Sequence, residues 1–295
     1  MADDDAVRPD SPPPADATAH APLPRELVLS GGGTGGLAML GALHRLHEQG
    51  RLVHVTRYVG ASVGAIVSSL LLSGYKPLTV YKVLEGLDFA GFAGNVNGDN
   101  VLGFFDTMGA MEPDGIMRLY DVMLSKQGYD DTVTLAEFDA RTGKTLLIAG
   151  YNVTRNETVG FSAQTHPRMP LRLAIRISIS VPILFRPVMY EGELYVDGAV
   201  MEHVPLRFAK YRRRTIVVHC YNKDPRVWPV ATNLLELTQQ LLRQLTRRLE
   251  DACVAKALAK RPETVIQVRV PQRQGGNSVV DYELDAAGKR EMFEG

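Results

Sequence analysis

The sequence has little cysteine, no excess charge of either sign and no long apolar run. Its 295 residues include only two cysteines, which excludes a disulfide framework and a cysteine-based zinc site. The 33 basic and 33 acidic side chains balance, so no net field attracts nucleic acid. The longest apolar run, Ile66 to Leu72, is too short to cross a bilayer. We expect a protein that is cytoplasmic or peripheral to membranes, with no nucleic-acid partner.

The first residues lack the basic and apolar regions of a signal peptide. Residues 1–24 are rich in aspartate, alanine and proline and hold almost nothing apolar, which predicts a disordered acidic tail. The remainder, 25–295, belongs to a chain with 45% hydrophobic residues and can bury a large core. We expect it to form a single domain that carries all of the chemistry.

Hydrophobic patterning predicts strands that alternate with helices from residue 25 onward. A strand over 26–30, a glycine loop over 31–36 and a helix over 37–49 are followed by a strand over 52–59. Further helices are expected over 76–86, 114–127, 171–180 and 232–258, and further strands over 144–151, 157–163, 191–197, 216–219 and 264–270. This order predicts an α/β fold with a mostly parallel sheet. The glycine-rich segment 88–113 is predicted to be a lid or a packed loop.

The stretch from Val55 to Val67 contains a Gly-x-Ser-x-Gly pattern between an expected strand and an expected helix. A turn that joins the two directly strains its central residue and crowds the positions two before and two after it. Gly60 and Gly64 meet that steric need. The pattern therefore predicts a nucleophile elbow with Ser62 as the nucleophile. An ordinary helix-capping serine is the structural alternative.

The glycine loop, Gly31 to Gly36, also matches the Gly-x-Gly-x-x-Gly pattern of dinucleotide sites. Such a site uses an acidic residue near the end of the second strand, but residues 51–61 contain none. Consecutive free amides beside a nucleophile can instead stabilise the oxyanion of acyl transfer. We therefore favour an oxyanion hole over a cofactor site.

A strand candidate over 191–197 ends in Asp197, with Gly198 and Ala199 directly behind it. A carboxylate can accept a serine proton when it lies within hydrogen-bond reach and partial burial raises its pKa. The two small residues would allow that close approach. Asp197 is the predicted base, although an Asp-Gly pair is also a common structural turn.

These three motifs, in this order and setting, resemble the patatin-like phospholipase family. The segment from Arg176 to Val188 is also similar to the family, so the resemblance runs from about Arg25 to Pro205. It implies a three-layer α/β/α fold and a phospholipase A-type enzyme that cleaves acyl-lipid esters with a Ser-Asp dyad. It implies neither cofactor nor metal, and the substrate suggests contact with a membrane surface.

Carried over by position, the resemblance makes Ser62 the nucleophile and Asp197 the base. The oxyanion hole would comprise Gly31, Gly32, Gly33 and Thr34. Two positions depart from the family pattern: Gly35 stands where the family usually has arginine or lysine, and His203 stands where it often has asparagine. A weaker oxyanion hole is one consequence, so a catalytically weak lipid-binding or effector module on the same fold is the rival hypothesis.

A second alternative is a Ser-His-Asp triad, because His219 closes a buried strand and could reach the catalytic edge. The basic residues from Arg207 to Arg214 are expected on a solvated face or facing anionic headgroups. The leucines of the long helix, from Leu234 to Leu249, recur at helical spacing and are expected to pack in the core.

Overall fold

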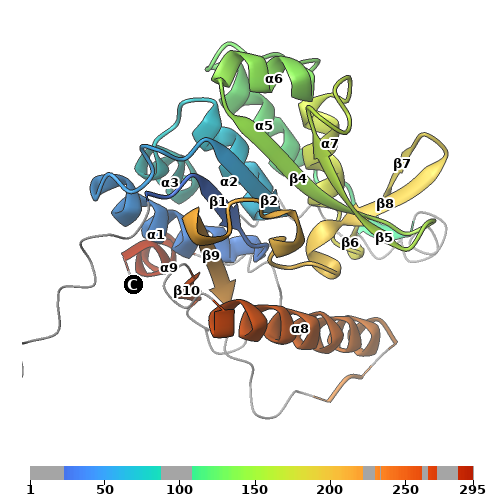
Figure 1. Cartoon of the computed structure of the whole chain (residues 1–295). Coiled ribbons are helices and arrows are strands. Elements are labelled where there is room, and N and C mark those ends of the chain that lie inside the picture. Colours follow the sequence, from blue (N-terminus) through green and yellow to red (C-terminus); the bar gives the residue numbers. More distant parts are fainter. Residues whose placement is uncertain are drawn as a thin grey trace, which may run out of the picture.

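The computed structural model describes residues 23–87, 108–221, 230–232, 234–260, 265–270 and 285–294. Within these ranges it shows a mixed sheet flanked by helices (Figure 1). The tail predicted over 1–24 lies almost entirely outside the described residues, as does most of the predicted lid or loop over 88–113.

The main sheet has eight strands in the order β10-β9-β1-β2-β4-β8-β7, with β5 paired to β4. The strands from β10 to β4 are parallel to their neighbours, whereas β5, β8 and β7 pair antiparallel. The bounds are β1 Glu26–Leu29, β2 Arg57–Ala61, β4 Thr145–Asn152, β5 Glu157–Ser162, β7 Val188–Tyr190, β8 Glu193–Asp197, β9 Thr215–Tyr221 and β10 Val265–Arg269. A separate parallel pair joins β3, Gly109–Met111, to β6, Ile183–Phe185.

The described helices include one of 27 residues, α8, which spans Leu234–Lys260. The others are α1 Gly36–Glu48, α2 Val63–Leu72, α3 Pro77–Glu85, α5 Asp114–Ser125, α6 Leu135–Thr142, α7 Leu171–Ser178 and α9 Ala286–Glu294. Figure 1 shows α8 on the opposite side of the sheet from α2 and α5. The arrangement is a three-layer α/β/α sandwich.

Alternate residues of the central strands point to opposite faces of the sheet, because side chains in a strand alternate. Leu27 and Leu29 of β1 join a large apolar core, which continues through Leu40 of α1 and Ile175 of α7. Val28, between the two leucines, faces the other side. There the apolar cluster is small and consists of Val28, Val59, Leu147, Val204, Val217 and Val254.

Most expected elements are confirmed to within a few residues, but one expectation about packing is wrong. The leucines of α8 predicted to lie in the core are exposed: Leu234, Leu237, Leu241, Leu245 and Leu249. The reason is that α8 turns the opposite side, with Val254 and Leu258, toward the sheet. Periodicity identified an apolar stripe but could not show which side the domain covers.

Candidate active site

Ser62 lies between the end of β2 and the start of α2, in a backbone conformation that side chains rarely adopt. Its φ is 54° and its ψ is −127°, and the side chain is largely buried. A Cβ added to Gly60 would lie 2.4 Å from the Gly64 carbonyl oxygen, and one added to Gly64 would lie 2.4 Å from the Ser30 carbonyl oxygen. Both glycines are therefore required for the turn, and the predicted elbow geometry is present.

A serine of α7 fixes the elbow from the side of the large core. The Ser62 N–H donates to Ser178 Oγ at 3.0 Å, and the Ser178 hydroxyl donates to the Ala149 carbonyl at 2.6 Å. Ser178 is fully buried. It therefore ties the strained residue to β4 through two hydrogen bonds in a low-dielectric environment. This role could not be predicted from the sequence, because Ser178 lies 116 residues from its partner.

Strands β2 and β8 meet end to end along one edge of β4. Strand β2 runs parallel to β4 as far as the Ala61–Ala149 pair, and β8 runs antiparallel to β4 and ends at the Asp197–Gly150 pair. Strand β5 occupies the other edge of β4 over the same residues. The residue that follows β2 is Ser62, and the last residue of β8 is Asp197. The topology therefore brings the two side chains together.

Asp197 is almost completely buried. Burial raises the pKa of its carboxyl to about 7, although hydrogen bonding from the Ser62 side chain and from the Ala199 N–H lowers it. The Ala199 N–H donates to Asp197 Oδ1 at 2.7 Å. A Cβ on Gly198 would lie 2.6 Å from the Ala149 carbonyl carbon, so this approach to β4 depends on glycine. A carboxyl with this pKa can accept a proton near neutral pH.

The glycine loop follows β1 and lies against the turn after Asp197. A Cβ on Gly31 would be 2.7 Å from the Ala199 Cβ. Gly32 and Gly33 have φ values of 143° and 53°, and no described group accepts a hydrogen bond from the N–H of either one. The Gly31 N–H instead donates to the His203 carbonyl at 2.9 Å. Of the predicted oxyanion donors, Gly32 and Gly33 therefore have amides with no acceptor among the described residues, whereas that of Gly31 is already used.

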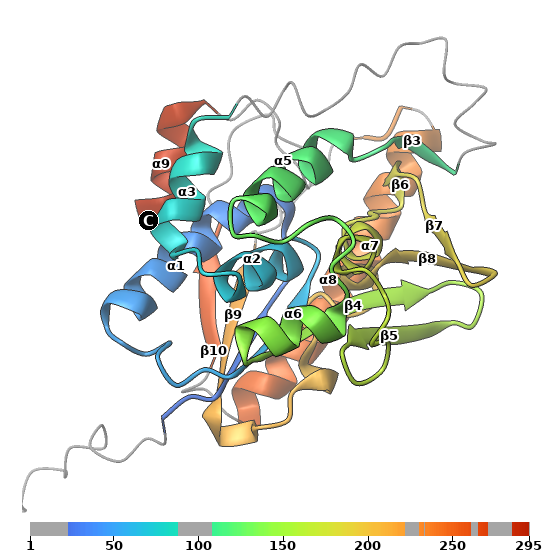
Figure 2. The ribbon, with the colours of Figure 1, turned by 90° about the horizontal axis from the view of Figure 1, so that it is seen from above.

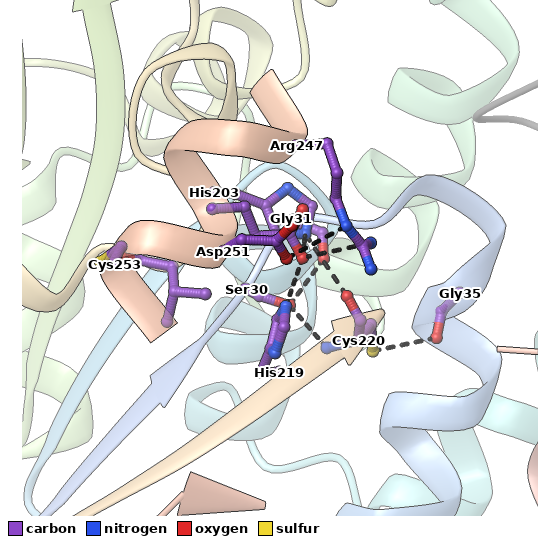
Figure 3. Close-up of polar contacts among 11 residues, drawn as sticks. Ser30, Gly31, Gly35, His203, His219, Cys220, Arg247, Asp251 and Cys253 are labelled. Carbon is purple, nitrogen blue, oxygen red and sulfur yellow. Dashed lines mark hydrogen bonds and ion pairs between the residues drawn. The ribbon is translucent and has the colours of Figure 1, made fainter. Parts of the chain in front are cut away.

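His219 lies in a different cluster, on the face of the sheet that α8 covers (Figure 3). Its Nε2 is hydrogen-bonded to Glu250 Oε1, and His203 Nε2 lies 3.8 Å from the same oxygen. Arg247 Nη1 is also 3.8 Å away. Burial lowers the pKa of His203. Burial by itself would raise the pKa of Glu250, but the His219 hydrogen bond and the nearby cationic groups bring it below its ordinary value.

The ligand atoms of His203, His219 and Glu250 lie within 4.8 Å of one another, the one such trio found among the described residues. Two imidazoles and a carboxylate are a ligand set that zinc uses. However, the Arg247 guanidinium and the histidine hydrogen bond already balance the carboxylate. The side chains come from three distant segments, which is why histidine spacing in the sequence did not reveal them.

Comparison with known proteins identifies the family. The family model for patatin-like phospholipases matches residues 27–210. The chain belongs to the patatin-like phospholipase family. A probable lipid hydrolase of Invertebrate iridescent virus 6 is 28% identical to this patatin-like protein over 226 residues, which are 72% of this chain and 70% of the viral one. An uncharacterized protein of Bacillus subtilis, YqhO, is 25% identical and aligns over 64% of this chain and 68% of its own length.

Two bacterial proteins of known structure share the fold of this patatin-like protein. VipD of Legionella pneumophila aligns with a TM-score of 0.56 and 17% identity, over 92% of this chain and 67% of VipD. The type III effector ExoU aligns with a TM-score of 0.52 and 17% identity, over 92% of this chain and 51% of ExoU. These neighbours support the patatin fold. The family match and the viral relative indicate a lipid-hydrolysing enzyme.

The two departures from the family pattern have structural counterparts. The space beside Gly35 is filled by Val270, whose Cγ2 would lie 2.8 Å from an added Cβ. The carbonyl oxygen of Gly35 accepts a hydrogen bond from the Cys220 thiol, with an Sγ–O distance of 3.3 Å. His203 supports the glycine loop through its own carbonyl and reaches Glu250 with its ring. The loop is therefore held by Cys220 and Val270 of the large core and by His203 on the α8 side, without a cation at position 35.

No helix in the described ranges is both long enough and apolar enough to cross a membrane. Of the basic residues expected to face solvent or headgroups, Arg213 and Arg214 directly precede Thr215, the first residue of β9. They are thus at the amino-terminal edge of the parallel strands, whereas Ser62 follows the carboxyl-terminal edge. Arg207 pairs with Glu202 at 2.9 Å, and Arg214 Nε donates to the Leu23 carbonyl. Arg207 therefore lies near the turn that follows Asp197, because the Glu202 N–H donates to the Gly198 carbonyl at 2.9 Å, whereas Arg214 lies at the other end of the strands.

Proposed function

We propose that this protein is a phospholipase A-type hydrolase that cleaves fatty-acyl esters of lipids with Ser62 and Asp197. The observation that carries the proposal is the strained Ser62 elbow beside a buried carboxyl whose pKa is about 7. Family membership and the viral relative's name support a lipid substrate. Neither carboxyl nor serine would need this costly arrangement for a purely structural role.

In the acylation step, Ser62 Oγ attacks the ester carbonyl carbon while its proton passes to Asp197. The carbonyl oxygen becomes an oxyanion, which the N–H groups of Gly32 and Gly33 stabilise. Collapse of the intermediate breaks the ester bond, and Asp197 gives its proton to the departing alcohol. A water molecule then attacks the acyl-serine, Asp197 accepts the water's proton, and that proton returns to Ser62 Oγ as the fatty acid leaves.

Two features favour the dyad over a triad that includes His219. The Val217 side chain faces α8, so His219, two residues later, faces α8 as well. Its Nε2 is engaged with Glu250 rather than with Ser62 or Asp197. In this mechanism His219 has a structural role only.

The test compares Ser62→Ala with wild type for fatty-acid release from mixed phospholipid vesicles and for labelling by a fluorophosphonate probe. We expect the variant to lose about four orders of magnitude or more in turnover, because the residues of a catalytic unit act together. It should also escape labelling. Ser73→Ala, the same change at the other end of α2, is the matched control and should behave like wild type.

Circular dichroism must show that the Ser62→Ala protein is folded. A folded variant that still releases fatty acid would overturn the assigned nucleophile. A wild-type protein that binds vesicles but neither reacts with the probe nor releases fatty acid would support the rival, a catalytically weak lipid-binding module.

A further inference from the structure

Helix α8 has its charged side and its apolar side reversed relative to an ordinary surface helix. Its charged residues Arg243, Arg247 and Glu250 lie on the side that faces the domain, together with Val254. The opposite side bears the five exposed leucines: Leu234, Leu237, Leu241, Leu245 and Leu249. A soluble surface helix normally shows the reverse arrangement. An exposed apolar patch of this extent marks an interaction surface.

Three of these leucines are more exposed than a packed side chain allows. The exposed fraction is 72% for Leu234, 50% for Leu241 and 61% for Leu245. With 100° per residue, all five fall within about one third of the helix circumference. The same arc continues toward the carboxyl end of α8 through the exposed residues Arg248, Ala252 and Lys256. We name this arc the leucine face.

The charges of the leucine face indicate what covers it. Arg248 and Lys256 are its charged residues, and no acidic side chain of the described part of α8 lies on that arc. Asp251, the nearest acidic residue, lies outside the arc and pairs with Arg247. A second copy of the chain docking through the same face would bring cations against cations without an acid to pair them. A surface of anionic lipid complements both the leucines and the cations.

The position of the leucine face fits such a surface. Val254 shares an apolar cluster with Val217, and Glu250, four residues earlier, reaches His219, two residues later in β9, so α8 runs antiparallel to β9. The leucines precede Glu250 along the helix, so the helix leads from Leu249 to Leu234 toward the carboxyl-terminal edge of the sheet, the edge that bears Ser62. In Figure 2 the same helix runs from the region below β9 and β10 toward β6. Glu250 also links α8, through His203, to the glycine loop.

We propose that the leucine face of α8 docks this protein on the surface of an anionic membrane, with the helix parallel to that surface. Leu234, Leu237, Leu241, Leu245 and Leu249 enter the interfacial region, and Arg248 and Lys256 contact the headgroups. The choice of a membrane as partner rests on the proposed function, because that function draws its substrate from a bilayer. The binding itself needs no turnover.

The experiment is flotation of the full chain with vesicles of phosphatidylcholine, alone or mixed with phosphatidylserine. Leu241→Ser/Leu245→Ser should weaken binding to the mixed vesicles by about tenfold or more, because two leucines lose their transfer into the interface. Arg248→Gln/Lys256→Gln should weaken that binding by about tenfold, with little change on phosphatidylcholine alone. The matched control is Val122→Ser/Val153→Ser, which removes two other exposed apolar side chains and should bind like wild type.

Hydrolysis of a soluble monomeric ester separates this proposal from the proposed function. The leucine variant should keep the wild-type rate on that ester while its vesicle hydrolysis falls with binding. If wild type hydrolyses neither substrate but the leucine variant loses binding, the docking surface stands and the catalytic proposal fails. Unchanged binding of the leucine variant would overturn the docking surface. The docking surface would also be overturned if light scattering showed that the wild-type protein is a dimer and that the leucine substitutions dissociate it.

Discussion

On one face of the sheet, helices α1, α2, α3, α5, α6 and α7 bury a continuous apolar core, whereas on the other face α8 covers a small group of valines and a cluster of buried charges. The catalytic candidates are held differently by the two faces. Ser178, on the side of the large core, fixes the Ser62 backbone. The glycine loop instead depends on His203, which contacts the α8 side. The difference teaches that the α8 layer contributes to the support of the glycine loop, whereas the Ser62 backbone is fixed from the side of the large core.

The strongest test of this division compares Asp197→Asn with His219→Ala. Asparagine cannot accept the Ser62 proton, so turnover should fall by about three orders of magnitude or more. His219→Ala removes a side chain of the α8 layer and should reduce turnover by less than about tenfold. Steady-state rates on a soluble ester measure both. If His219→Ala lost more turnover than Asp197→Asn, His219 would be the base, and the α8 layer would take part in the chemistry.

The Asp197→Asn protein must be shown to be folded, and its unfolding free energy also tests the raised pKa of Asp197. Burial raises the folded-state pKa of Asp197 to about 7. The contribution of its protonation to the unfolding free energy is therefore fully present below about pH 3.9 and is lost as the pH rises through 7. At pH 8, asparagine removes a buried charge. Urea unfolding at that pH should therefore show a variant at least as stable as wild type.

The next largest effect should come from pH. Because Asp197 must be ionised to accept a proton, kcat/KM should fall about tenfold per unit below pH 7. An unperturbed histidine titrates at about 6.5, so the wild-type profile alone does not distinguish the two bases. Profiles of wild type and His219→Ala should have the same acid limb. A limb that disappears with His219 would assign the titration to the imidazole.

Ser178→Ala probes the support given by the large core. It leaves the buried Ser62 N–H without an acceptor, which should cost about 1–3 kcal/mol of unfolding free energy. Looser positioning of the nucleophile should lower kcat by about tenfold. Ser69→Ala is the control: its hydroxyl bonds to Ile66 and Tyr120 in the same layer. Equal losses of kcat in the two variants would show that Ser178 contributes to stability rather than positioning.

Glu250→Gln probes the α8 layer and should have the smallest effect on turnover, about two- to fivefold, because it reaches the glycine loop only through His203. The loss of a buried, paired carboxylate should cost about 1–3 kcal/mol of unfolding free energy. Asp251→Asn, which changes the exposed neighbouring carboxylate, should stay within about 0.5 kcal/mol of wild type in unfolding free energy.

Treatment with EDTA should leave the turnover of the wild-type protein unchanged. Complete inactivation by either Glu250→Gln or EDTA would place this cluster in the chemistry.

The sequence was sufficient for features that depend on local geometry. The Gly-x-Ser-x-Gly elbow was predicted because only glycines fit on either side of such a turn, and strand β1 was predicted from its apolar run. Helix α6 was missed, although Thr134 and Glu137 form a capping box that the sequence displays. With only eight residues, the helix carries too short a periodic pattern to be distinguished from a loop by periodicity.

Other features depend on contacts between distant segments, which a single sequence does not encode locally. Ser178, His203 and Glu250 gain their roles only when α7, the turn after β8 and α8 meet the sheet. The orientation of α8 was misjudged for the same reason. A helical repeat of leucines looks identical whether it faces a core or the outside.

The contact between Gly35 and Val270 restricts the order in which substitutions could be accepted. Position 35 has ordinary helical backbone angles, so a side chain is opposed by space and not by conformation. An arginine introduced there alone would collide with Val270, 2.8 Å from the new Cβ. Val270→Ala would remove the colliding methyl groups, so that position 35 could then accept the arginine that the family usually carries there. Gly35 and Val270 are thus coupled by direct contact, and a side chain at position 35 requires a smaller residue at position 270.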